Sequence, residues 1–344
     1  MVQNAQGTIR RVKRCKRTMA SVCVIIPAFD AEYTIARAVR SALAEPEVAE
    51  VVVVDDGSTD CTGAAARRAG DDSGRLSIVR FEKNRGPSAA RNAAIAASTS
   101  PLLAILDADD YFIPGRFANL IDDGDWDLIA DNVVFVPEAH SKAADIKALT
   151  TDSSRRRPLR FDEFVGRNIS RRGQSRGELG FLKPIMRRTL LDRLALRYDE
   201  SVRLGEDYIL YATALSKGAR FTIAERPGYV AIERQRSLSG RHRTADLASL
   251  LAADRRLERG IRTPSARRLV AAHARSIDRK HDHRQFLDVN AARGAAAAIR
   301  PFLGRPAALF ALSAAVLRDK LKPLARSARP PAIRLLLGPQ EFRS

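Results

Sequence analysis

Two patterns of apolar residues alternate over the first 140 residues of the chain. Short runs rich in β-branched residues are typical of strands, and longer segments with apolar residues on one face are typical of helices. The short runs predict strands at 22–27, 51–55, 76–81, 102–107 and 126–136. The segments between them predict helices at 32–44, 60–69 and 87–98.

This alternation predicts an α/β fold. Strands that are buried on both faces read as continuous apolar runs, as "VVVVD" at 51–55 does. Helical connections between such strands imply a mostly parallel, twisted sheet of the α/β class, flanked by helices. Sheets of this kind bind ligands beyond the carboxyl ends of their strands, so we expect the ligand site at that edge.

Polar residues gather where four of the predicted strands end. These strands run into "PAFDAE", "VDDGSTD", "EKNRGPSAARN" and "DADD". A single acidic loop is usually a solvated turn, but four converging loops favour a functional site. The crowding of Asp107, Asp109 and Asp110 points the same way, because neighbouring carboxylates repel one another.

The motifs of two common nucleotide-binding classes are missing from the sequence. No GxGxxG follows the first strand and no GxxxxGK[ST] occurs, which argues against a dinucleotide oxidoreductase and a P-loop enzyme. Without a glycine-rich cradle, a diphosphate would have to be held by a cation. Asp-Ala-Asp at 107–109 offers hard oxygen ligands that suit Mg²⁺ or Mn²⁺. Such an ion neutralises a diphosphate leaving group as its bond to carbon breaks.

Charge is spread unevenly along the 344 residues, whose formal net charge is +19. Residues 1–20 hold six Lys/Arg and no acid, 21–240 hold 31 basic and 32 acidic residues, and 241–344 hold 22 basic and eight acidic residues. We therefore predict a disordered basic N-terminal extension at 1–20, a catalytic domain at 21–240, and a helical basic C-terminal region at 241–344. Met19 is an alternative start of the chain.

The basic surface attracts polyanions, either nucleic acid or an anionic membrane. A basic nucleic-acid-binding protein stays open as an alternative of a different class. Its only support is the isoelectric point of about 10.6, and the 6% of aromatic residues form no stacking-rich motif of the RNA-binding modules. We therefore expect no specific nucleic acid partner.

No apolar stretch reaches the roughly 18–20 residues that span a bilayer. The nearest, "PAALFALSAAVL" at 306–317, could lie in a membrane interface or pack in a helical core. We interpret the two histidines of "HDH" at 281–283 as part of a solvated face. The three cysteines show no CxxC spacing, which fits a reducing cytosol.

Five segments of the chain together resemble family 2 glycosyltransferases of the GT-A fold. In order along residues 20–240, they are "SVCVIIPAFDAEYTIARAVRSAL", "VVVVDDGSTDCT", "NRGPSAARNAAI", "LLAILDADDYFIPGRF" and "LGEDYILYATALSKGARF". Within the family, the chain is most similar to bacterial exopolysaccharide glucosyltransferases of the succinoglycan type. The resemblance implies inverting transfer of a sugar from a nucleotide sugar, usually UDP-linked, to an acceptor hydroxyl.

The resemblance also implies roles for residues at the donor side. The residues that would flank the uracil are Pro27, Ala28 and Phe29. Asp56 would accept the uracil N3 hydrogen. Arg91 could reach the ligand edge or serve on the surface, and both remain open. Arg236 of "ERQRSLSG" would close over the nucleotide.

The resemblance makes Asp107 and Asp109 a DxD motif that holds the metal, with Asp109 favoured as the direct ligand and Asp107 also serving the nucleotide sugar. Asp207 of "GEDY" matches the catalytic base, with Glu206 next to it. Inversion by direct displacement needs one base to take the acceptor's proton. Acids are also favoured in the first turn of a helix by the helix dipole alone, but the other motifs favour the base.

The resemblance therefore implies a metal-dependent hexosyltransferase that moves glucose from UDP-glucose onto a polyprenyl-diphosphate-linked oligosaccharide in exopolysaccharide biosynthesis. We expect it in the cytoplasm, in peripheral contact with the anionic inner face of the cell membrane. A soluble or protein acceptor is the alternative. The QxxRW signature of processive relatives is absent, which favours one sugar per visit.

Overall fold

The computed structural model describes residues 21–140, 153–169, 178–234, 243–321 and 333–342. Its strands are β1 (Val22–Ala28), β2 (Val48–Asp55), β3 (Leu76–Arg80), β4 (Leu102–Ile105), β5 (Tyr111–Phe112), β6 (Leu128–Pro137), β7 (Arg156–Leu159), β8 (Ile185–Arg187), β9 (Phe221–Glu233) and β10 (Arg334–Leu335).

Eleven α-helices lie within the described residues. They are α1 (Ile35–Leu43), α2 (Thr62–Arg68), α3 (Pro87–Ala97), α4 (Arg116–Leu120), α5 (Phe161–Asn168), α6 (Arg188–Arg193), α7 (Glu206–Ser216), α8 (Thr244–Gly260), α9 (Pro264–Arg293), α10 (Ala295–Ile299) and α11 (Pro306–Leu321). Short 3₁₀ helices are η1 (Glu138–His140), η3 (Leu179–Phe181), η5 (Arg300–Phe302) and η7 (Pro339–Phe342).

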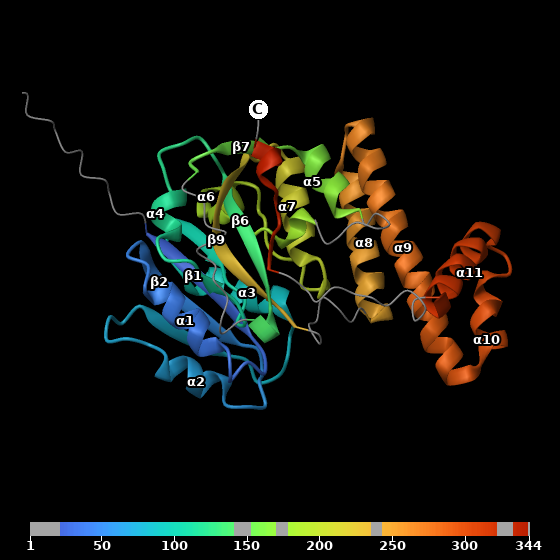
Figure 1. Ribbon diagram of the computed structural model, residues 1–344, viewed down its shortest axis with the longest axis horizontal. Coiled ribbons are helices and arrows are strands. Elements are labelled where there is room, and N and C mark those ends of the chain that lie inside the picture. Colours follow the sequence, from blue (N-terminus) through green and yellow to red (C-terminus); the bar gives the residue numbers. More distant parts are fainter. Residues whose placement is uncertain (1–20, 141–152, 170–177, 235–242, 322–332, 343–344) are drawn as a thin grey trace, which may run out of the picture.

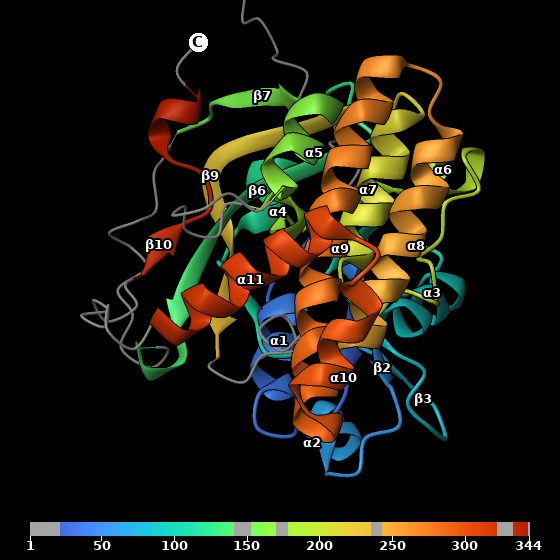
Figure 2. The same ribbon diagram turned by 90° about the vertical axis from the view of Figure 1, so that its right-hand side faces the viewer.

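All these strands join one sheet, in the order β3-β2-β1-β4-β8-β6-β9-β5, with β10 beside β6 and β7 beside β9. Figure 1 shows α1 and α2 near the first strands, α8 and α9 side by side, and α10 and α11 beyond α9 at one end of the molecule. Figure 2 looks at that end, where α10 and α11 lie in front of α9. The predicted α/β class with flanking helices is confirmed.

The half of the sheet from β3 to β4 is parallel, as predicted. Its strands and helices match the predicted ranges to within a few residues, because continuous apolar runs mark strands that are buried on both faces. The other half of the sheet contains both parallel and antiparallel strand pairs. β8 pairs antiparallel with β4 and β6, while β6 and β9 are parallel. β8 has only three residues, too few to show a pattern in the sequence.

The start of α3 follows from two residues. Gly86 has a φ of 93°, which favours glycine, and Pro87 occupies the first turn, where no backbone N–H is needed. The buried face of α1, with Ile35, Val39 and Ala42, packs on the core of the sheet. Together these helices cover the strands whose ends carry the polar motifs.

The C-terminal region is helical, as expected, and its last described residues return to the sheet. β10 pairs with β6, and the Asn132 amide both donates to the Leu337 carbonyl (2.8 Å) and accepts from its N–H (3.0 Å). Leu337 is fully buried in the main core. Residues 334–337 are therefore a structural part of the sheet and its core, although charge alone places them in a separate region. The division at residue 240 stays a prediction, and 1–20 lie outside the described residues.

Across the described ranges, no helix combines the length and apolarity that crossing a membrane requires.

Candidate active site

The loop after β4 places its three carboxylates in different surroundings. Asp110 is buried and accepts hydrogen bonds from the Tyr229 hydroxyl (2.7 Å) and the Ile232 N–H (2.8 Å). Burial, followed by the charges of Asp109 and Asp107, raises its pKa well above the usual range. Asp110 therefore anchors the loop to β9, which explains one of the three crowded acids.

Asp109 is held by its backbone, and its carboxylate stays accessible. Its carbonyl accepts a hydrogen bond from Arg37 (2.7 Å), while its side chain is 34% exposed. The Nε atom of Arg234 lies 3.7 Å from the carboxylate. Burial and the charge of Asp107 raise the pKa of Asp109. A cation at this position would offset both effects.

Two buried cations connect the predicted motifs. Arg91 on α3 lies 2.5 Å from Glu206, 3.0 Å from Asp107 and 3.9 Å from Asp207. Lys183, just before β8, lies 2.8 Å from Asp107 and 2.7 Å from Asp207. The Arg91 side chain is only 3% exposed and lies against Asp107, so it is inside the site and not on the surface. The DxD motif and the predicted base thus share both cations.

We call this group the charge cluster; its members are Asp107, Asp109, Glu206, Asp207, Arg91 and Lys183. It holds four carboxylates and two buried cations. Burial alone would raise the pKa of Asp107, but Lys183 and Arg91 outweigh it and lower that pKa to about 2. Burial raises the pKa of Glu206 despite Arg91. Even with Arg234 near Asp109, carboxylates outnumber cations here, and hard carboxylate oxygens suit Mg²⁺ or Mn²⁺.

The first turn of α7 fixes Asp207. Gly205 before it has a φ of 75°, and a Cβ there would lie 3.1 Å from Leu250, so glycine is favoured at this position. The Asp207 carboxylate accepts hydrogen bonds from the hydroxyls of Tyr198 (3.1 Å) and Tyr211 (3.4 Å). These contacts and Lys183 orient a carboxylate that is almost wholly buried, which is more than a helix terminus alone requires.

The donor-side residues lie together at the ends of β1 and β2. The Asp56 N–H donates to the Ala28 carbonyl (2.8 Å), and Phe29, the next residue, is 46% exposed. Pro27 is part-buried in β1. The Asp56 carboxylate, 3% exposed, accepts the N–H groups of Arg85 (2.6 Å) and Gly86 (2.8 Å). Asp56 therefore holds the loop before α3, and its contact with uracil stays a prediction.

The site also contains residues that were not predicted from the sequence, among them Lys183, Tyr198 and Arg234. The sequence signal that could have pointed to Lys183 is its position inside the apolar stretch "FLKPIM", where a charged residue is unexpected. Arg236, predicted to close over the nucleotide, lies outside the described residues. Arg234, two positions earlier, lies near Asp109 (3.7 Å) and Glu138 (3.5 Å).

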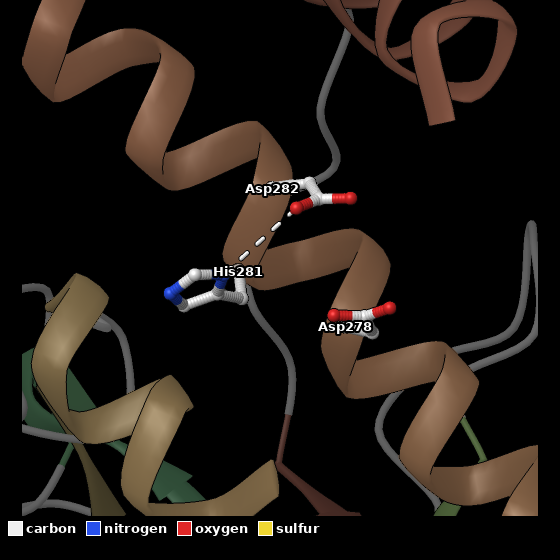
Figure 3. Close-up of side chains that lie close together, drawn as sticks. All are labelled: Asp278, His281 and Asp282. Carbon is white, nitrogen blue, oxygen red and sulfur yellow. Dashed lines mark ion pairs between the residues drawn. The ribbon is translucent and has the colours of Figure 1, made fainter. Parts of the chain in front are cut away.

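A second group of possible metal ligands lies on α9 (Figure 3). Its members are Asp278, His281 and Asp282. Arg305 already lies 3.0 Å from Asp282 and 3.7 Å from Asp278, so a guanidinium supplies the positive charge there. Asp282 is buried and both histidines of 281–283 are part-buried, which corrects the interpretation of this segment as a solvated face.

The mixed sheet with its flanking helices, and the polar residues at the carboxyl ends of its parallel strands, match the GT-A fold. The solved structure of S. aureus TarS 1–349 in complex with UDP superposes with a TM-score of 0.56. The match covers 92% of this chain and 95% of that one at 15% sequence identity, which shows the fold alone.

The sequence matches name the family. The model of glycosyl transferase family 2 matches residues 23–185. The succinoglycan biosynthesis protein ExoU of Rhizobium meliloti (strain 1021) is 50% identical over 315 residues, which cover 91% of this chain and 92% of ExoU. The chain belongs to glycosyltransferase family 2 and is a nucleotide-sugar-dependent glycosyltransferase, as predicted.

A shorter match is to the UDP-Glc:alpha-D-GlcNAc-diphosphoundecaprenol beta-1,3-glucosyltransferase WfaP of Escherichia coli. WfaP is 32% identical over 102 residues, which cover 29% of this chain and 32% of WfaP.

Proposed function

We propose that this enzyme transfers glucose from UDP-glucose, with inversion, to a hydroxyl of a polyprenyl-diphosphate-linked oligosaccharide in exopolysaccharide assembly. The similarity to ExoU over most of both chains supports the pathway class. The UDP-glucose donor and lipid diphosphate acceptor in the name of WfaP support the same donor and acceptor here. Such an acceptor places the enzyme in the cytoplasm, at the inner face of the cell membrane.

One observation carries the catalytic part of the proposal. Lys183 lies between Asp107 of the DxD motif and Asp207, with distances of 2.8 and 2.7 Å. The predicted base is thus held beside the residues that would hold the donor diphosphate. In this arrangement Asp207 takes the proton of the acceptor hydroxyl as its oxygen attacks the anomeric carbon. Arg91 holds Glu206 and Asp107 in place and favours their ionised forms.

The metal would be Mg²⁺ or Mn²⁺, with Asp109 as its direct ligand and Asp107 beside it. When bound, it supplies positive charge to the diphosphate leaving group. The accessible carboxylate of Asp109 fits this role, while Asp110 is fully engaged by Tyr229 and Ile232.

Thermal unfolding with and without metal tests the donor site. We expect UDP-glucose to stabilise the wild-type protein in the presence of Mn²⁺, by about 2.7 kcal/mol at a donor concentration 100 times the dissociation constant. Excess EDTA should remove that stabilisation. Asp109→Asn should remove it too, and should nearly abolish transfer while leaving the fold intact.

Asp110→Asn is the matched control, because it changes the neighbouring acid, whose pKa is already raised well above the usual range. It should keep the Mn²⁺-dependent stabilisation by UDP-glucose. Equal stabilisation of the wild type in excess EDTA would show that the donor binds without the metal, and full activity of Asp109→Asn would remove Asp109 from the site.

A further inference from the structure

Helix α11 has two apolar faces, and only one of them is packed. Its inner face, with Leu312 buried and Leu309 and Val316 part-buried, joins Phe286 and Phe302 in a small core of its own. The segment 306–317, which could have been interfacial or core from its sequence, is therefore core on this side. A helix with apolar residues on all its sides is normally buried on all of them, so we expect the second apolar face of α11 to be covered as well.

We call the opposite side the outer face of α11; its members are Pro306, Ala307, Phe310, Ser313, Ala314 and Leu317. They recur at spacings of three and four residues and so lie on one side of the helix. All are exposed except Ala314, which is part-buried. Phe310 is 78% exposed and Leu317 59%. No member of this face carries a charge, which is unusual for a surface that faces water.

Exposed apolar side chains concentrate in this part of the molecule. Seven large ones occur among the described residues, and four of them are Ile299, Leu303, Phe310 and Leu317. Helices α10 and α11 lie beyond α9, at the end of the molecule away from α1 and α2 (Figures 1 and 2). Single exposed apolar residues need no explanation, but this grouping indicates a surface that meets a partner.

Charge identifies the kind of partner. Residues 241–344 hold 22 Lys/Arg against eight Asp/Glu. Arg293 and Arg300, which flank α10, are exposed, and no acid pairs with either of them in the described part of the chain. Two copies meeting through such a surface would bring like charges together, whereas an anionic bilayer attracts them.

We propose that the outer face of α11, with Leu303 and the exposed arginines Arg293 and Arg300, is the surface by which the enzyme sits on an anionic membrane. Phe310 and Leu317 would enter the boundary between headgroups and acyl chains, and the arginines would contact anionic headgroups. This inference rests on the proposed function, because a lipid-linked acceptor is what makes attachment useful.

Co-sedimentation of the full-length protein with vesicles tests the surface. The vesicles are pure phosphatidylcholine or phosphatidylcholine with phosphatidylglycerol. We expect the wild type to sediment with the anionic vesicles, and Phe310→Glu/Leu317→Glu to lower its partition coefficient by about tenfold or more, because apolar contact is replaced by charge. Arg293→Gln/Arg300→Gln should lower it less, and mainly at low salt, because screening already weakens that contact at high salt.

Ala64→Glu/Ala96→Glu is the matched control, since it adds the same two charges at exposed positions of α2 and α3. It should leave vesicle binding within about twofold of the wild type. Circular dichroism and thermal unfolding verify that each variant is folded. Point variants are needed here because a truncation near residue 245 would also remove β10 from the sheet.

Three outcomes overturn the proposal. In the first, the wild-type protein does not sediment with anionic vesicles. In the second, Ala64→Glu/Ala96→Glu lowers vesicle binding as much as Phe310→Glu/Leu317→Glu does. In the third, the wild type is a dimer that Phe310→Glu/Leu317→Glu converts to a monomer while vesicle binding stays unchanged. Hydrolysis of UDP-glucose, measured in the absence of vesicles, distinguishes failure of the proposed membrane surface from failure of the proposed function. Vesicle binding can fail while hydrolysis persists, and the wild type can bind vesicles while turning over no UDP-glucose.

Discussion

Replacing Asp207 with asparagine should lower the turnover number by about 10²–10⁴, the usual range for loss of a general base. Asparagine has almost the same shape: its oxygen can accept from the ammonium of Lys183, and its NH2 group can donate to the hydroxyl oxygen of Tyr198. It cannot take the proton of the acceptor. Binding of UDP-glucose and Mn²⁺ should therefore stay close to that of the wild type. Isothermal titration measures the binding, and initial rates of sugar transfer measure the turnover.

Glu206→Gln is the comparison within the same helical turn. Glu206 is paired with Arg91 (2.5 Å), and we assign it no proton transfer, so its loss should reduce turnover less than that of Asp207. If Asp207→Asn loses donor binding together with turnover, Asp207 has a structural role. The two acids in the first turn of α7 then serve to stabilise the N-terminus of that helix.

Replacing Lys183 with methionine should lower the free energy of unfolding by about 3–5 kcal/mol, because it leaves two nearby carboxylates without their shared cation. Asp107 and Asp207 would repel each other and move apart. A displacement on the order of 1 Å in such a site costs about 10² in rate, so turnover should fall strongly too. Urea unfolding and transfer rates measure the two effects. Lys217→Met, at an exposed position after the last turn of α7, should change stability by less than about 0.5 kcal/mol.

The stability effect of Lys183→Met should depend on pH. Asp107 has a pKa of about 2 in the folded protein, below the roughly 3.9 of an unfolded aspartate. The contribution of ionised Asp107 to the free energy of unfolding is therefore present above about pH 4 and is lost as the pH falls toward 2. Asp107 and Asp207 outweigh burial and raise the pKa of Lys183, so Lys183 stays charged throughout this range. The difference in free energy of unfolding between Lys183→Met and the wild type should be largest near neutral pH and should shrink in acid. A difference that is constant from about pH 7 to about pH 3 would contradict this account.

Much of this site could be predicted because its signals are local. Strands β1, β2 and β4 are continuous apolar runs, and Asp107 and Asp109 follow directly after one of them. The acids of "GEDY" lie beside a glycine that starts a helix. In each case a few neighbouring residues carry the pattern, so no tertiary contact is needed to recognise it.

The remaining features depend on contacts between distant segments. Lys183 reaches Asp107 only because the three-residue strand β8 enters the sheet antiparallel to β4. The difference between Asp109 and Asp110 depends on Tyr229 and on the backbone of β9. Two residues of β10 return the chain to the sheet, a signal too short to outweigh the basic composition around it. Charge patterns mark surfaces well, but they do not mark the boundaries of a hydrophobic core.

The anomeric configuration of the first product tests the central claim most directly. A single displacement, with Asp207 as the only base, brings the acceptor oxygen to the face opposite the leaving diphosphate. UDP-glucose is α-linked, so nuclear magnetic resonance of the early transfer product should show a β-linked glucose. A product with the α configuration would contradict the account, since retention requires a mechanism other than one displacement assisted by one base.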